Sequence, residues 1–201
     1  VHGIPIVSVD IQIDPSHDLT CIRIQKLIRG LIMSGRICAI WMGTPCSSWS
    51  MVRNMPGGPP AMRNSWFPMC LENLGPRDRL HCGLGNKLMK FSAGVLQLCN
   101  MYNIPAVMEN PHTSLIWQAP ALVHIRSLVG MRTFVTDFCM WGAPWRKRTR
   151  FLCTGVNLEN GCRLCGSRGG KCSRTHKPHV KLAVKTNGVF RTLLALSLRH
   201  L

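Results

Sequence analysis

Acidic residues are scarce in this sequence. Only 8 Asp and Glu residues stand against 25 Lys and Arg residues, which gives a formal net charge of +17 at pH 7. Such an excess of positive charge attracts polyanions, and nucleic acid is the first candidate. The alternatives are a basic surface with no polyanionic partner and a surface that binds an acidic protein. We expect nucleic acid, specifically duplex DNA, as the partner of a monomeric chain.

Long apolar runs are missing as well. No stretch of about 18 uncharged apolar residues is present, so we predict no membrane-spanning helix. The amino terminus lacks the basic region, the apolar stretch and the cleavage site of a signal peptide. We therefore expect an intracellular protein, nuclear if the source is eukaryotic. Because the chain begins at Val1 and enters an apolar run almost at once, we expect it to be a piece of a longer chain.

A disulfide framework is not indicated either. The 11 Cys residues are odd in number and are scattered through apolar segments, such as those that hold Cys38, Cys99 and Cys139. Buried thiols in a reducing compartment are the expected form of such residues.

Apolar residues make up 46% of the chain and follow two periodicities. Continuous apolar runs predict strands at 4–10, 37–42, 104–108, 132–139 and 149–154. Helical spacing predicts helices at 19–34, 86–102 and 120–128. Strands that alternate with helices indicate an α/β fold with a parallel sheet.

Two segments break this alternation. Residues 43–85 are rich in Pro, Gly, Met, Arg and Asn, and a loop of this length is usually functional or disordered. Residues 157–201 are Gly-rich, basic and Cys-bearing. We therefore divide the chain into a domain at 1–156 and a basic tail at 157–201.

Two chemically distinctive residues follow predicted strands. Cys46 comes after the strand at 37–42, within GTPCSSWS, and Glu109 ends the strand at 104–108, within AVMENP. In an open parallel sheet, ligands bind outside the carboxyl ends of the strands. A thiol there can be a nucleophile if its surroundings lower its pKa, and a desolvated carboxylate can be a general acid. The alternatives are an inert thiol and a carboxylate that only terminates its strand.

Together the two side chains match one reaction. Attack of a thiolate on carbon 6 of cytosine builds negative charge in the ring, and an acid near ring nitrogen 3 stabilises that charge. Both groups must reach the same base, which has to leave its stack. Two adjacent parallel strands that end in Cys46 and Glu109 would supply this geometry.

Three segments resemble motifs of the cytosine-5 DNA methyltransferases, in the family's order. GTPCSSWS is similar to Gly-Pro-Pro-Cys-Gln-x-Phe-Ser, MENP to Glu-Asn-Val, and GAPWRKRTRFLCTG to Gly-x-Pro-Gln-x-Arg-x-Arg-x-Phe. The resemblance covers residues 4–155. It implies a Rossmann-like S-adenosylmethionine-dependent methyltransferase sheet, parallel and with helices on both faces. It also implies methyl transfer to carbon 5 of cytosine in DNA.

The resemblance assigns roles to individual residues. Cys46 would add to carbon 6, Glu109 would assist at nitrogen 3, and an Arg of the third segment would hold the base or a phosphate. Alignment of the flanking Gly, Pro and Phe puts the family's two Arg positions at residues 147 and 149. A shift by one residue puts them at Arg148 and Arg150, which we take as the candidates.

The resemblance also implies cofactor contacts. Asp10 matches the acidic residue that holds the ribose of S-adenosylmethionine, Asp18 lies in a segment similar to the family's adenine-binding Gly-Asp-Ile, and Pro45 belongs to the Pro-Cys motif. The family's Gly-rich turn after its first strand has no counterpart here, so we expect a methyltransferase sheet that is amino-terminally incomplete. We do not expect these 201 residues alone to be active. The alternatives are a catalytically inactive nucleic-acid-binding remnant, for example from a mobile-element polyprotein, and another Rossmann-like transferase with a structural Cys46.

The loop after Cys46 matches the family's catalytic loop in position. Its polar and basic side chains are candidates for contacts with nucleic acid: Ser47, Ser48, Arg53 and Arg63. The alternative is that these arginines only solvate a long loop.

The tail contains a concentration of metal-ligating residues, in CRLCGSRGGKCSRTHKPH at 162–179. Cys and His side chains in fours form tetrahedral Zn²⁺ sites. We take as the candidate ligands Cys162, Cys165, Cys172 and His176. The alternative is a flexible basic loop, and the family resemblance places a small target-recognition segment here.

Overall fold

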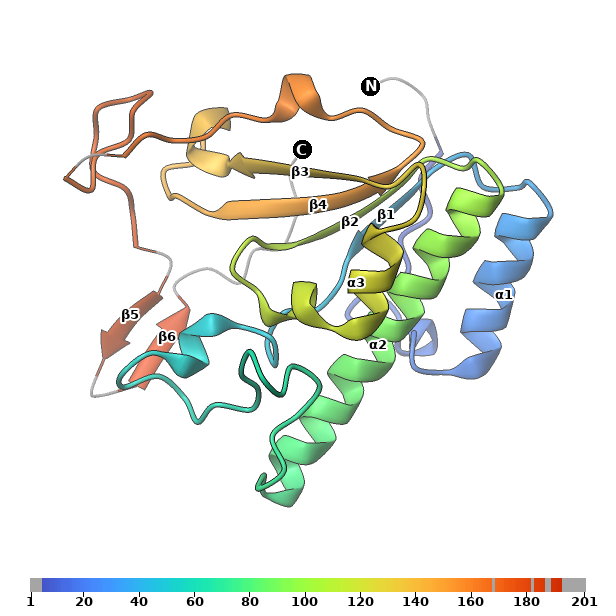
Figure 1. Ribbon diagram of the computed structural model, residues 1–201, viewed down its shortest axis with the longest axis horizontal. Coiled ribbons are helices and arrows are strands. Elements are labelled where there is room, and N and C mark those ends of the chain that lie inside the picture. Colours follow the sequence, from blue (N-terminus) through green and yellow to red (C-terminus); the bar gives the residue numbers. More distant parts are fainter. Residues whose placement is uncertain (1–4, 168, 182, 187–188, 193–201) are drawn as a thin grey trace.

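A four-stranded sheet forms the centre of the computed structural model, which describes residues 5–167, 169–181, 183–186 and 189–192 (Figure 1). Its strands are β1 (Ile40–Gly43), β2 (Ala106–Pro111), β3 (Arg132–Asp137) and β4 (Arg148–Thr154), in the order β1-β2-β4-β3. β1 and β2 are parallel, and β4 is antiparallel to both of its neighbours. β1, β2 and β3 therefore run in one direction. The predicted α/β class is confirmed, whereas the prediction of an all-parallel sheet is wrong.

The lengths of the connections explain these directions. The long helix α2 (Pro76–Met101) lies between β1 and β2, and such a crossover returns the chain in the same direction. Residues 138–147 join β3 to β4, through η4 (Phe138–Trp141) and Gly142 at φ 106°. This connection is too short for a parallel crossover, so β4 returns antiparallel to β3, and it lies between β2 and β3.

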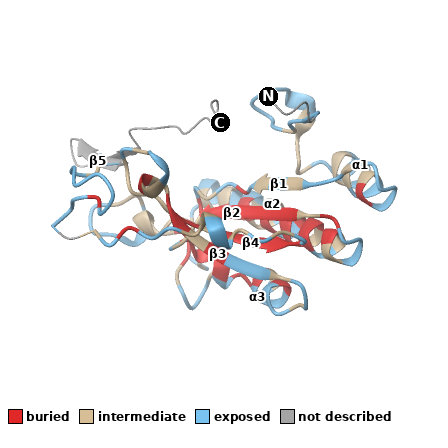
Figure 2. Cartoon of the chain, turned by 90° about the horizontal axis from the view of Figure 1, so that it is seen from above, coloured by how far each residue is buried: buried red, intermediate tan, exposed pale blue. Residues whose placement is uncertain are grey.

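The α-helices gather on one face of the sheet. Two others accompany α2, namely α1 (Ile22–Met33) and α3 (Pro120–Arg126). The main core joins these helices to the face that carries Met108 and Leu152. Figure 2 shows buried residues concentrated in β2, β4 and α2. α2 begins with Pro76 at its first position and Asp78 in its first turn, both favourable at a helix start.

The opposite face of the sheet has a different cover. A second cluster there joins Val107, Phe134 and Phe151 to the apolar side chains of the segment at 156–162. That segment contains only a 3₁₀ turn, η5 (Glu159–Gly161). Among the described residues this cluster contains no α-helical side chain, so the prediction of helices on both faces is wrong for this part of the chain.

The predicted strand at 4–10 is not formed by its described part, residues 5–10. Ile6 and Val7 are 85% and 87% exposed, and the chain turns at Asp10–Asp14 before η1 (Pro15–His17). An apolar run becomes a buried strand only when another strand pairs with it, and none of the described strands pairs with this one.

Beyond β4 the tail continues into a two-stranded antiparallel sheet, β5 (Ala183–Thr186) and β6 (Val189–Thr192). The described residues also include short 3₁₀ turns at η2 (Met51–Asn54) and η3 (Leu115–Gln118). In the part of the chain described here, none of the helices is long and apolar enough to cross a membrane.

Candidate functional site

The carboxyl ends of β1 and β2 lie side by side, as the sequence predicts. Gly43 of β1 is in register with Glu109 of β2, and Cys46 follows three residues later. The loop that carries Cys46 is fixed from two sides. The Asn110 side-chain amide donates to the Thr44 carbonyl at 2.6 Å, and the Thr44 hydroxyl lies 2.7 Å from that of Ser92 on α2. The neighbouring Pro45 is exposed.

A lysine completes the site. The Lys147 ammonium lies 2.9 Å from a carboxylate oxygen of Glu109, whose side chain is only 9% exposed. Lys147 comes just before β4, and its Nζ also lies 5.1 Å from the centre of the Phe138 ring. A nearly buried carboxylate is thus paired with a cation, which removes most of the penalty for burying its charge.

Both charges act on the Cys46 thiol. Burial raises the pKa of Cys46 above its ordinary value, Lys147 lowers it, and Glu109 raises it. Of these effects, desolvation of the thiolate is the largest, so the surroundings as a whole raise the pKa of Cys46 even though Lys147 lowers it. The site brings together a half-buried thiol, a carboxylate and an ammonium.

The two Arg candidates do not join this site. The Arg148 guanidinium donates to both carboxylate oxygens of Asp137, at 3.1 and 2.8 Å, and Arg150 lies 5.4 Å from the centre of the Trp117 ring. Successive residues of a strand face opposite sides of the sheet, so Arg148 and Arg150 share one side and Lys147, just before the strand, lies on the other. The unshifted alignment, which selects residue 147, is the one that places a cation at Glu109. The flanking Gly, Pro and Phe were the sequence signal for it.

Arg63 is a structural residue rather than a phosphate ligand. It is 1% exposed and lies 3.4 Å from the centre of the Trp49 ring. Its guanidinium makes six hydrogen bonds, to the carbonyls of Ser48, Pro68, Met69 and Cys82 and to the side chains of Ser48 and Asn86. The proposed nucleic-acid contacts of Arg63 and of the buried Ser48 are therefore wrong, since neither side chain faces solvent.

The other two loop candidates remain accessible. Ser47 is exposed, and its hydroxyl lies 2.9 Å from Nε2 of His81. The half-buried Arg53 donates to the carbonyls of Ser47 and Pro60, at 3.0 Å each. These contacts stabilise the loop that follows Cys46, and both side chains remain at least partly exposed. Their contact with nucleic acid stays a prediction.

The candidate cofactor residues Asp10 and Asp18 do not form a shared binding site. The exposed Asp10 accepts a hydrogen bond from the Gln12 amide, and Asp18 accepts from the amide and hydroxyl of Thr20. The bonds to Thr20 also lower the pKa of Asp18. Both carboxylates are thus used in local turns.

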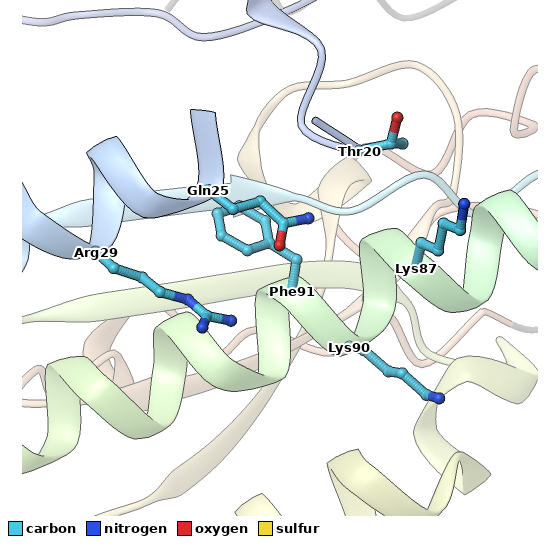
Figure 3. Close-up of a pocket in the computed structure, with 6 residues that line it drawn as sticks. All are labelled: Thr20, Gln25, Arg29, Lys87, Lys90 and Phe91. Atoms are coloured by element: carbon cyan, nitrogen blue, oxygen red, sulfur yellow. The ribbon is translucent and has the colours of Figure 1, made fainter. Parts of the chain in front are cut away.

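The pocket beside Thr20 has a volume of about 280 Å³. Its lining, drawn in Figure 3, consists of Thr20, Gln25, Arg29, Lys87, Lys90 and Phe91. Three cations and no carboxylate line it, which suits an anion and disfavours the positively charged sulfonium of S-adenosylmethionine. This pocket therefore does not fit that cofactor, and Asp10 and Asp18 do not line it.

A second cluster lies just beyond the carboxyl end of β3, where Cys139 follows the strand. Ligating atoms of Cys139, Cys165, Cys172 and His179 all lie within 4.8 Å of one another, and this Cys₃His group can hold a metal ion such as Zn²⁺. Two of the predicted ligands, Cys165 and Cys172, belong to this cluster.

The other two predicted ligands lie elsewhere. Cys162 contacts the Leu158 carbonyl and packs into the second core cluster, and His176 is exposed at φ 57°. Sequence reasoning missed Cys139 because it lies in an apolar segment far from the tail. His179 was visible in the sequence as the second His of HKPH.

No protein-family model, curated protein or solved structure matches this chain.

Proposed function

We propose that this chain binds a cytosine base of nucleic acid at a covalent-addition site of the cytosine-5 methyltransferase type. Cys46 is the nucleophile, and the Glu109–Lys147 pair holds the polar edge of the ring. The observation that carries the proposal is a half-buried thiol beside a carboxylate–ammonium pair, at the carboxyl ends of two parallel strands. The common direction of β1, β2 and β3 also suits a methyltransferase-like sheet.

The polar edge of cytosine is complementary to this pair. The exocyclic amine at carbon 4 donates, whereas nitrogen 3 and the oxygen at carbon 2 accept. Glu109 can accept from the amine while Lys147 donates to an acceptor of the same edge. The base reaches both groups only after it leaves its stack, and the net charge of +17 favours binding of the surrounding phosphates.

The addition step moves electrons from sulfur into the ring. The Cys46 thiolate forms a bond to carbon 6, the C5–C6 double-bond pair shifts to C4–C5, and the C4–N3 pair moves onto nitrogen 3, which takes a proton from the Glu109–Lys147 pair. Carbon 5 is then nucleophilic and takes a proton from water. Reversal removes a proton from carbon 5 and expels the thiolate, so carbon 5 exchanges its hydrogen.

This exchange gives a test that needs no methyl donor. Oligonucleotides with tritium at carbon 5 of cytosine, single-stranded and duplex, are incubated with the full chain, and tritium released to water is counted. We expect release by the native chain and by Cys38→Ala, which removes an exposed thiol, and none by Cys46→Ala. Release that persists in Cys46→Ala, or no release by the native chain, contradicts the proposal.

Methyl transfer from S-adenosylmethionine, which the motif resemblance implies, needs binding residues other than Asp10 and Asp18. A duplex with 5-fluorocytosine tests it, because fluorine at carbon 5 blocks the final elimination after methylation. An adduct that survives denaturation only when S-adenosylmethionine is present would add methyl transfer to base addition.

The second candidate function is binding of nucleic acid without base chemistry. The cationic pocket lined by Arg29, Lys87 and Lys90 favours it, because it offers a site for a phosphate on the surfaces of α1 and α2. Salt-sensitive binding of the same oligonucleotides without any tritium release is the result that selects this function over the first.

A further inference from the structure

We infer that Cys139, Cys165, Cys172 and His179 hold one structural zinc ion, which fastens the basic segment at 162–180 to the end of β3. This inference does not depend on the chemistry proposed for Cys46.

The four ligating atoms have the spacing of a tetrahedral site. Zinc binds thiolate sulfur at about 2.3 Å, so two sulfurs on one ion lie roughly 3.8 Å apart. All ligating atoms here lie within 4.8 Å of one another, and the Cys165 sulfur lies 3.7 Å from Nε2 of His179. Small movements of the side chains close this arrangement around an ion.

The burial of the group indicates a closed site. Cys139, Cys165 and Cys172 are only 1 to 3% exposed, and they form a small cluster of their own. Structural zinc sites use four protein ligands and leave no open position, whereas catalytic sites keep one for water or substrate. Three thiols and one imidazole are also a ligand set that selects zinc over harder cations such as Mg²⁺.

The second ring nitrogen of His179 has a partner that orients the ring. Its Nδ1 lies 3.1 Å from the Gly170 carbonyl, which can only accept a hydrogen bond. That contact places the proton on Nδ1 and leaves Nε2, the nitrogen facing Cys165, with a free lone pair. A carbonyl behind a zinc-bound histidine is the usual supporting contact.

Hydrogen bonds also orient the Cys165 sulfur and would stabilise it as a thiolate. The amide and hydroxyl of Ser173 both point at it, at 3.4 and 3.5 Å, as donors do toward a metal-bound thiolate. The Cys165 amide in turn donates to Asp137 at the end of β3.

The turn at 171–178 fixes the positions of the other two tail ligands, Cys172 and His179. The Cys172 amide donates to the Lys177 carbonyl, and a bridge joins Lys171 to Pro178, so Cys172 and His179 flank the same turn. Arg174 reaches back and donates to the Cys139 carbonyl at 3.1 Å. The tail thus meets η4 around the four ligands, and an ion there would lock the two segments together.

The experiment measures metal content and ligand identity on the full chain. The chain is purified under reducing conditions, dialysed against zinc and then metal-free buffer, and assayed by mass spectrometry for bound zinc. Replacement by Co²⁺ reports the ligands, since tetrahedral thiolate sites give intense visible and near-ultraviolet bands. We expect about one ion per chain, as four ligands complete one tetrahedral site.

Single substitutions separate this ligand set from the set that the sequence alone suggested. His179→Asn and Cys139→Ser should lower zinc affinity and alter the cobalt spectrum, whereas Cys162→Ser and His176→Asn should leave both unchanged. His179 is partly exposed, so its variant should fold even if the buried Cys139→Ser does not.

Two results would overturn the inference. One is a native chain that retains no zinc after this dialysis. The other is loss of zinc in Cys162→Ser or His176→Asn while His179→Asn retains it. Limited trypsin digestion gives an independent reading, because a chelator should speed cleavage in the basic segment of the native chain and leave His179→Asn unaffected.

Discussion

Cys46, Glu109 and Lys147 form a small electrostatic system in which two neighbours act on one thiol in opposite directions. The thiolate is the reactive form of cysteine, so any change in the pKa of Cys46 changes its reactivity at a given pH. Burial raises that pKa, Lys147 lowers it and Glu109 raises it. Reactivity should therefore increase as the pH rises through a pKa that lies above the ordinary value for cysteine.

Neutralising Lys147 and neutralising Glu109 should shift the pH dependence of Cys46 reactivity in opposite directions. In Lys147→Gln the pKa of Cys46 rises further, so alkylation by iodoacetamide begins at higher pH. In Glu109→Gln a negative charge is lost, the pKa falls and alkylation begins at lower pH. Peptide-resolved mass spectrometry across a pH series measures both, with the exposed Cys38 as an internal control in each sample. Shifts in the same direction for both variants would refute the arrangement.

Arg63 is a buried cation that no carboxylate neutralises among the described residues; carbonyls, amide and hydroxyl oxygens surround it instead. Arg63→Ala leaves several buried acceptors without a donor, and each costs about 1 to 3 kcal/mol. We expect a loss of about 3 kcal/mol or more in the free energy of unfolding, measured by urea denaturation. Arg53→Ala, in the same loop, should cost about 1 kcal/mol or less, because Arg53 is partly solvated. Equal losses would contradict the structural role of Arg63.

At the scale of elements, α2 does more than cross from β1 to β2. It begins at Pro76 rather than at residue 86, and its first three turns hold the loop that follows Cys46. Gly85 lies in that part of the helix, where an added Cβ would meet Ser48 Oγ at 2.4 Å and the side chains of Arg63 and Trp49 at 3.1 Å. The helix and the loop therefore touch at a position where only glycine fits without movement.

Two glycines of α2 give a matched test of this contact. At Gly83 nothing lies within 4 Å of an added Cβ. Gly83→Ala should therefore stabilise the chain by about 0.5 to 1 kcal/mol, the ordinary gain in a helix. Gly85→Ala should destabilise it instead, because Ser48 must turn away from Arg63. Thermal and urea unfolding of the two variants measure the difference, and a stabilised Gly85→Ala would show that the loop does not pack there.

At the scale of the whole molecule, the net positive charge is the property that most affects binding of nucleic acid. A net charge of +17 predicts that nucleic-acid affinity falls steeply with salt, because each phosphate contact releases a counterion. If the pocket between α1 and α2 binds phosphates, the triple variant Arg29→Gln, Lys87→Gln, Lys90→Gln should bind more weakly. The slope of log affinity against log salt should also become shallower by about 0.9 for each lost contact. Fluorescence anisotropy at several salt concentrations measures both.

The control changes the same amount of charge elsewhere. It replaces three exposed arginines outside the pocket with Gln: Arg23, Arg36 and Arg132. If the control and the pocket variant lose affinity equally, binding follows net charge alone and the pocket is not a phosphate site.

The sequence by itself determined the local features of this protein. Periodicity located the three α-helices and the strands β2, β3 and β4 within a few residues, except for the early start of α2, where the polar first turns lack a clear apolar stripe. It also put Cys46 just after one strand and Glu109 at the end of the neighbouring strand, since apolar runs end where the chain leaves the core. These features depend on residues close together in sequence.

Only the tertiary structure decided which distant residues meet. It left 5–10 without a strand partner, inserted β4 antiparallel between β2 and β3, and put Lys147 rather than Arg148 beside Glu109. It likewise brought Cys139 to the tail cysteines in place of Cys162. For Lys147 and Arg148 the physical reason is the register of β4. Strand pairing sets the register, register sets which side of the sheet a side chain occupies, and a shift of one residue exchanges the two sides.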